Sequence, residues 1–209
     1  MSQSDTLDAQ VRAADPDRWL SSRFVADEGA RADLVALYAF EAELLNIPTR
    51  VTQPLLAEMR YVWWREQMDG VFAGVPRKGH PVLEALTDMV ARRALDRAPF
   101  DALIDAHVGR VHGEQHDLDA FYTRPMQAAV RLLAGPGHDD AVGGAGRMWG
   151  LTQVGRLDEA RDLRSAVNRD LKSLPPTAFP AVAHLAAAGA TGEGVKRLRM
   201  TWASLTGRI

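Results

Sequence analysis

Residues 33–74 read DLVALYAFEAELLNIPTRVTQPLLAEMRYVWWREQMDGVFAG, and this stretch decides the fold class. Its first part has apolar residues at spacings of three and four, as on one helix face: Leu34, Leu37, Tyr38, Leu44 and Leu45. We therefore expect a helix from about residue 30 to 45, stopped by Pro48. A second helix is expected over 52–73, with Gly74 and Pro76 ending it. It carries Leu55, Met59, Val62, Trp63 and Phe72.

The rest of the chain shows the same helical periodicity and no convincing strand alternation. Further helices are predicted over 81–95, 99–112, 117–134, 139–155, 157–173, 178–188 and 193–206. The short connections between them are typical of antiparallel neighbours in a bundle. The sequence thus predicts an all-α protein: a flexible segment over 1–14, then one antiparallel helical bundle over 15–209.

Composition excludes several classes of protein. A hydrophobic content of 46% over 209 residues allows a real core, and the net charge of −2 argues against a general nucleic-acid binder. The chain has no cysteine, which excludes disulfides, thiolate catalysis and Cys-ligated metals. The polar, acidic start is not a secretory signal, and no apolar run is long enough to span a membrane. We expect a cytoplasmic protein, with peripheral contact to the inner membrane as the alternative.

Several motifs together resemble the squalene/phytoene synthase family. The run Leu37-Tyr38-Ala39-Phe40 is followed by Arg60-Tyr61-Val62-Trp63-Trp64-Arg65, which is similar to the family's Arg-x-x-Trp-Trp-Arg-like signature. Residues 15–19, 80–83 and 99–104 are similar to other helix starts of the family. The resemblance covers roughly residues 15–160 and implies a bundle of the isoprenoid-synthase type, shortened at its C-terminus.

The resemblance also shows what is missing. In the synthases, paired aspartates on facing helices bind the magnesium ions that hold the substrate diphosphate, because hard cations neutralise its charge. Where the first aspartates should fall, residues 45–49 read LNIPT, without a carboxylate. At the second motif Gln153 stands near the expected Asn and Leu157 at the expected Asp. Asp158 and Asp162, four residues apart, are the weak catalytic candidates, and a solvated acidic helix face is the alternative.

Four further residues are candidates for lining a ligand cavity. Glu41 falls on the apolar stripe of its helix, so its carboxylate should line a polar cavity or pair with an arginine such as Arg60 or Arg65. Arg60 and Trp64, at positions i and i+4, could stack as a cation–π pair or simply cover a helix surface.

Three other features have competing interpretations. His112, Glu114 and His116 have the spacing of a metal site but resemble a polar linker, so we assign no metal ligand. Small residues at Gly143, Gly144, Gly146 and Gly150 favour close approach of another helix or a ligand over nucleotide binding. The final helix carries Val195, Leu198, Trp202 and Leu205 among basic residues. The simpler interpretation is that this last helix caps the core; the alternative is that it binds in a groove of a partner or at a membrane interface.

These observations lead to three hypotheses of function. The first is a non-catalytic binding or assembly factor, since the subgroup that the Trp63-Trp64-Arg65 run resembles includes the mitochondrial complex I assembly factor. Its partner would be a protein or an isoprenoid-like ligand, and no cofactor is implied. The second is an active enzyme that condenses two prenyl diphosphates head to head, which would require magnesium. The third is an isoprenoid-binding carrier.

Overall fold

The computed structural model describes residues 3–93 and 95–209, and over these residues the protein is all-α, without a strand. The helices are α1 (Gln3–Ala14), α2 (Pro16–Ser22), α3 (Glu28–Arg50), α4 (Pro54–Phe72), α5 (Pro81–Arg93), α6 (Ala98–Val111), α7 (Arg124–Ala134), α8 (Asp139–Gln153), α9 (Leu157–Asp170) and α10 (Glu193–Thr206). Four short turns join them: the π turn η1 (Asp119–Thr123) and the 3-10 turns η2 (Leu171–Ser173), η3 (Phe179–Ala181) and η4 (Ala183–Ala187). The all-α prediction is confirmed.

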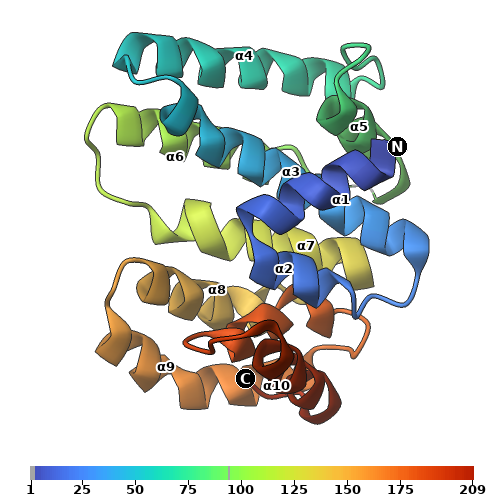
Figure 1. The fold of residues 1–209 in the computed structure, drawn as a ribbon, viewed down its shortest axis with the longest axis vertical. Coiled ribbons are helices and arrows are strands. Elements are labelled where there is room, and N and C mark those ends of the chain that lie inside the picture. The colour runs from blue at the N-terminus through green and yellow to red at the C-terminus, as the bar shows by residue number, and fades with distance from the viewer. Residues whose placement is uncertain (1–2, 94) are drawn as a thin grey trace.

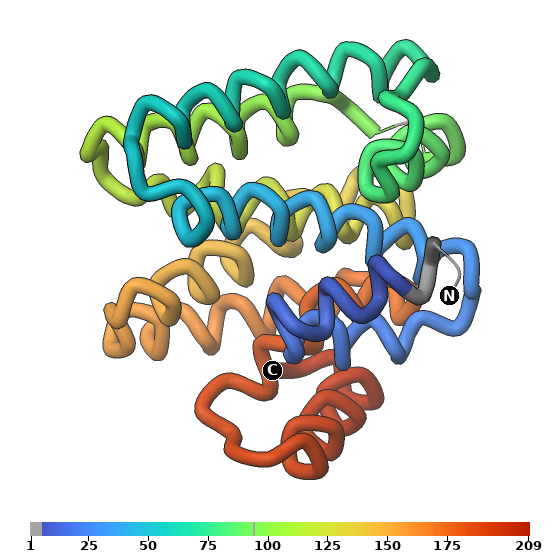
Figure 2. Tube along the Cα trace, turned by 45° about the horizontal axis from the view of Figure 1, so that its top comes forward, coloured from blue at the N-terminus to red at the C-terminus, as the bar shows by residue number. Residues whose placement is uncertain are grey.

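Helix α3 runs through the middle of the molecule and organises the layers around it (Figure 1). Helices α4, α5 and α6 form the layer on one side, and α7, α8 and α9 lie on the other (Figure 2). Helix α3 packs against α1, α4, α5 and α7, so residues on most of its faces are buried. The core is therefore continuous, from Leu7 in α1 to Ile209 at the C-terminal end of the described chain.

Helix α3 does not stop at Pro48, as the sequence predicted, but continues to Arg50. A proline inside a helix cannot donate to the carbonyl four residues earlier, which here belongs to Leu44. That carbonyl instead accepts a hydrogen bond from the buried hydroxyl of Tyr61, at 3.2 Å. The Tyr61 hydroxyl from α4 thus replaces the donor that Pro48 lacks, and helix α3 continues past the proline.

Helix α4 presents a different face to the core from the one that the sequence suggested. Leu55, Met59 and Val62 are exposed. The buried side belongs to a second apolar stripe with the same spacing: Ala57, Tyr61, Trp64, Met68 and Val71. Periodicity found the helix, but two apolar stripes on one helix made the choice of face ambiguous.

The N-terminal residues are helical, which corrects the prediction of a flexible segment over 1–14; residues 1–2 lie outside the described residues. Leu7 and Val11 of α1 are buried and pack against α3, because they stand four residues apart on one face. The segment 178–188, predicted as a helix, forms the two 3-10 turns η3 and η4 instead. In the described part of the chain, no helix has the length and apolar character needed to cross a membrane.

Candidate functional site

A cavity of about 250 Å³ lies between the start of α2 and helices α3, α6, α7 and α8, beside η1 and η4. Its walls are polar at one end and aromatic or aliphatic elsewhere. The residues that line it are Ala14, Asp15, Arg18, Tyr38, Glu41, Leu45, Leu103, His107, His116, Phe121, Tyr122, Met126, Ala129, Trp149, Gln153, Ala181 and His184. This central cavity therefore draws on almost the whole length of the chain.

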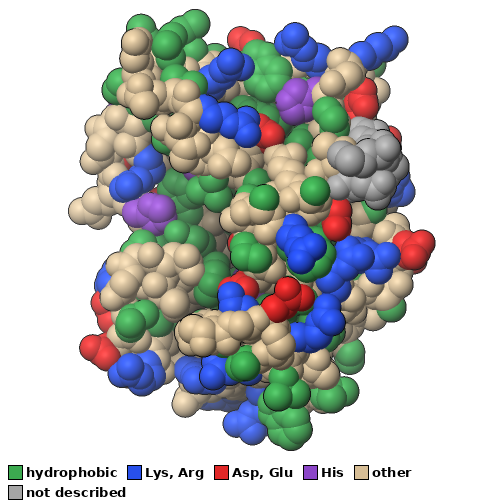
Figure 3. Space-filling model, in the orientation of Figure 1, with side chains coloured by type: hydrophobic (Ala, Val, Ile, Leu, Met, Phe, Trp, Pro, Cys, Tyr) green, Lys and Arg blue, Asp and Glu red, His purple; other side chains and the backbone are tan. Residues whose placement is uncertain are grey.

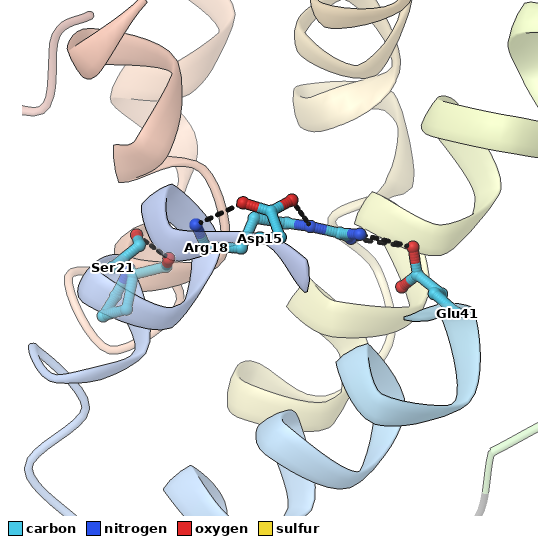
Figure 4. Close-up of polar contacts among 5 residues, drawn as sticks. Asp15, Arg18, Ser21 and Glu41 are labelled. Atoms are coloured by element: carbon cyan, nitrogen blue, oxygen red, sulfur yellow. Dashed lines mark hydrogen bonds and ion pairs between the residues drawn. The ribbon is translucent and has the colours of Figure 1, made fainter. Parts of the chain in front are cut away.

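The polar end of the central cavity is built around Arg18. Asp15 caps the start of α2: its Oδ1 accepts the backbone N–H of Arg18, and its Oδ2 accepts the Arg18 Nε–H, both at 2.9 Å. The two terminal nitrogens of Arg18 both donate to Oε2 of Glu41 at 2.8 Å (Figure 4). Ser21 fixes α2 in place by donating to the carbonyl of Pro180 at 2.5 Å. One guanidinium thus bridges two carboxylates that come from different helices.

Burial and charge act against each other in this cluster. Burial alone would lower the pKa of Arg18, but the charges of Glu41 and Asp15 outweigh it and raise that pKa. Burial raises the pKa of the Glu41 carboxyl despite the neighbouring guanidinium. The pKa of Asp15 is lowered, because the Arg18 charge and hydrogen bonds exceed the opposing effect of burial. The pKa of the Tyr38 hydroxyl is raised by burial, and its ring lies 4.5 Å from the Arg18 guanidinium carbon.

Three buried side chains around Arg18 have polar atoms without a hydrogen-bond partner in the described chain. They are the Tyr38 hydroxyl, Oε1 of Glu41 and both ring nitrogens of His184. All three residues line the central cavity. Buried polar groups left without a partner are costly, so a cluster of them marks a place where a ligand or water would bind.

Aromatic rings form the rest of the wall. His116 stacks on Phe121 with ring centroids 4.4 Å apart, and its Nε2 lies 3.1 Å from the Tyr122 hydroxyl. Trp149 meets His184 edge to face at 5.2 Å. These flat surfaces suit an apolar or planar ligand body next to the polar end.

The structure separates the residues that the sequence grouped as one cavity. Glu41 lines the central cavity and pairs with an arginine, but that arginine is Arg18 and not Arg60 or Arg65. Arg60 and Trp64 line another pocket of about 370 Å³, and Arg65 pairs with Asp105 at the surface.

The two aspartates proposed as a displaced motif lie outside both pockets. Asp158 and Asp162 are exposed on α9, and Asp158 pairs with Arg161 at 2.7 Å. His116 lines the central cavity, whereas Nε2 of His112 lies 3.4 Å from Glu58. Over residues 3–93 and 95–209, no group of three or more His, Cys, Asp or Glu side chains is placed to hold a metal ion.

Sequence reasoning missed Arg18, Tyr38 and His184 as site residues. Arg18 and Tyr38 stand inside motifs that carried the family resemblance, so those motifs were a usable signal. Nothing near His184 marks it, because the surrounding segment is rich in alanine and its partners lie far away in the sequence.

Two buried histidines predict how stability depends on pH. The pKa of His184 is lowered to about 3 by burial and the Arg18 charge, and that of His107 to about 4 by burial and nearby positive groups. In the unfolded chain both take up a proton near pH 6.5, so stability is complete above that pH and falls as the pH drops toward 4. The raised pKa of Glu41 acts in the opposite direction, whereas the lowered pKa of the partly buried His116 adds to the loss. We expect a net loss of roughly 2 kcal/mol between pH 7 and pH 5.

Urea denaturation at pH 7, 6 and 5 measures this loss. The double variant His107→Gln/His184→Gln should show a much flatter pH dependence than the wild-type chain. Equal slopes for the two proteins would mean that other groups control it.

The family model for squalene/phytoene synthases matches residues 11–124, which is more than half of the 209-residue chain. No curated protein and no solved structure matches the chain. The matched range contains Arg18, Tyr38 and Glu41, the residues that build the polar end of the central cavity. This all-α chain therefore belongs to the squalene/phytoene synthase family.

Proposed function

We propose that this chain is a squalene/phytoene synthase-like protein that does not transfer prenyl groups and acts as a binding or assembly factor. The observation that carries the proposal is the composition of the central cavity. Leu45, which by resemblance stands where the first motif would have an aspartate, lines it, and so does Gln153, near the position of the second motif's Asn. Leucine is not a ligand of magnesium, and Leu157, where the second motif would have its Asp, is exposed on α9 and does not line the cavity.

The carboxylates that are present in the cavity do not fit a magnesium–diphosphate site. Asp15 and Glu41 both hold the guanidinium of Arg18, which leaves Oε1 of Glu41 as the free oxygen of that carboxylate. With both carboxylates ionised, the cluster of one cation and two anions is net negative. A diphosphate would meet repulsion here, because no counter-charge remains for it.

The active-enzyme alternative would depend on Asp158 and Asp162. Both are exposed on α9 outside the central cavity, and Asp158 already pairs with Arg161. An acidic helix face in solvent accounts for them, and they offer no second wall of ligands for a metal.

The chemistry of the cavity favours an uncharged ligand with a hydrogen-bonding head and an apolar body. Tyr38 offers a hydroxyl donor, Glu41 an acceptor, and neutral His184 one donor and one acceptor. The rings of Phe121 and Trp149 line the remainder. An isoprenoid-like molecule without a diphosphate meets these requirements.

The assembly role follows from the subgroup that the sequence resembles. The Trp63-Trp64-Arg65 run together with the missing aspartates supports a function like that of the mitochondrial complex I assembly factor. Its test is genetic: cells without this chain should assemble less respiratory complex I, measured as NADH dehydrogenase activity in isolated membranes. Normal activity in such cells would contradict the role.

Binding and turnover are tested with one pair of ligands. We expect geranylgeraniol to raise the melting temperature of the purified protein, and geranylgeranyl diphosphate with magnesium to give no diphosphate release. Variant Tyr38→Phe should weaken the effect of the alcohol, and Asp158→Ala should leave it unchanged. Release of diphosphate that Asp158→Ala or Asp162→Ala abolishes would show an active enzyme and refute the proposal.

A further inference from the structure

Helix α10 leaves its apolar face in solvent. The exposed fractions are 47% for Val195, 70% for Leu198, 68% for Trp202 and 78% for Leu205. Their spacing of three, four and three residues places them on one helix face. The residues that α10 buries against the protein are Met200 and Ala203, on the other side. Helix α10 thus packs on the core through Met200 and Ala203, as expected of a last helix, but its apolar stripe takes no part in that contact.

The position of α10 makes the stripe accessible. The helix lies at one end of the molecule, and it contacts mainly η4 and α2 (Figure 1). In the same orientation, hydrophobic side chains reach the surface at this end, with Lys and Arg side chains beside them (Figure 3). A contiguous patch of exposed apolar side chains on a protein surface usually marks an interaction site.

Basic residues flank the stripe. Arg197 and Arg199 are exposed on the two sides of the apolar face, and Arg208 is exposed just after the helix. Lys196 is turned toward the protein, where it pairs with Asp17 at 2.6 Å. Within α10 the only acidic residue is Glu193, at the first position. An apolar face that contains tryptophan, between arginines, is the pattern of a helix that lies in a membrane interface.

We infer that α10 docks this protein in the plane of a bilayer that contains anionic lipid. The stripe would enter the boundary of head groups and acyl chains, while Arg197 and Arg199 would meet the lipid phosphates. The charge of the flanking residues favours a lipid surface over a second copy of the chain as the binding partner. Symmetric pairing of two α10 stripes would bring the flanking arginines of both copies together, and like charges oppose such a contact. The inference rests on α10 alone and is independent of the ligand in the central cavity.

Vesicle sedimentation tests the docking. The full chain is mixed with phosphatidylcholine vesicles, with or without one quarter phosphatidylglycerol, at low and high salt. We expect the wild-type protein to bind the anionic vesicles at least tenfold more tightly than the neutral ones, and high salt to reduce this preference. Variant Leu198→Ser/Trp202→Ser should lose at least tenfold of the binding. Variant Arg197→Gln/Arg199→Gln should lose the preference for anionic lipid.

A matched control lies at the opposite end of the molecule from α10. Leu55 and Met59 are also exposed, on α4, so Leu55→Ser/Met59→Ser removes a similar apolar area far from α10 (Figure 1). This variant should bind vesicles like the wild type. All these side chains are exposed, so urea midpoints should stay unchanged and show that each variant folds. Equal loss in the α4 control, unchanged binding by the α10 variant, or a wild-type dimer that ignores vesicles would overturn the inference.

Discussion

Replacing Arg18 by methionine is expected to lower the free energy of unfolding by about 3–5 kcal/mol. The side chain is buried among Asp15, Tyr38 and Glu41, and both its terminal nitrogens bond one Glu41 oxygen. Without the guanidinium, the Glu41 carboxylate has no cation beside it and must bear its desolvation alone or take up a proton. Urea denaturation at pH 7 measures the loss.

A second variant separates the charge effect from lost packing. In Arg18→Met/Glu41→Leu both partners become apolar, so the buried Glu41 carboxylate is no longer left without a cation, while Asp15 loses the guanidinium in the single and in the double variant alike. Stability should therefore recover by at least half of the loss. Tyr38 and Asp15 are unchanged in both proteins and serve as the common background. If the double variant is as unstable as the two single changes added together, the pair is not coupled.

Gly146→Ala is expected to destabilise the protein by about 1–3 kcal/mol. An added Cβ would lie 2.5 Å from the Cα of Thr123 and 3.1 Å from the carbonyl oxygen of Tyr122, and both are backbone atoms of η1. Backbone cannot rotate aside, so α8 and η1 would have to separate. Because η1 carries Phe121 and Tyr122, the wall of the central cavity would move with it.

Gly143→Ala, on the same helix, is the control for this change. Its Cβ would meet nothing closer than Nε2 of Gln127 at 4.0 Å. Alanine favours helix more than glycine does, so this variant should gain roughly 0.5–1 kcal/mol. If close packing against η1 is the reason for Gly146, thermal or urea unfolding should show stability changes of opposite sign for the two variants. A loss at both positions would show that α8 responds to substitution in general.

The close approach at Gly146 also answers a question that the sequence left open. Small residues on the predicted helix 139–155 suggested contact with another helix or a ligand. At Gly146 the neighbour is the backbone of η1, and at Gly150 it is the ring of Tyr122, 2.6 Å from an added Cβ. Gly146 and Gly150 therefore allow the close packing that positions the wall of the cavity.

Local patterns in the sequence were enough to predict most helices. Apolar spacing, prolines and glycines depend on neighbours within a few residues, and they located α4, most of the later helices and the start of α3 close to their observed bounds. The resemblance to the synthases, and not these local patterns, placed Leu45 where a metal-binding aspartate would stand. The apolar spacing itself identified Glu41 as a carboxylate that requires a special environment, because a charge on an apolar stripe must find a partner.

Only the tertiary structure decided which faces are buried and which groups meet. Helix α3 passes Pro48 because Tyr61, from another helix, bonds the carbonyl of Leu44. Glu41 meets Arg18 across 23 residues, and Ser21 meets Pro180 across 159. The stripe of α10 looks from the sequence like a face for the core, and it lies in solvent because Met200 and Ala203 fill that place instead. Helix formation is a short-range property of the chain, whereas pairing and burial depend on how all the helices share one core.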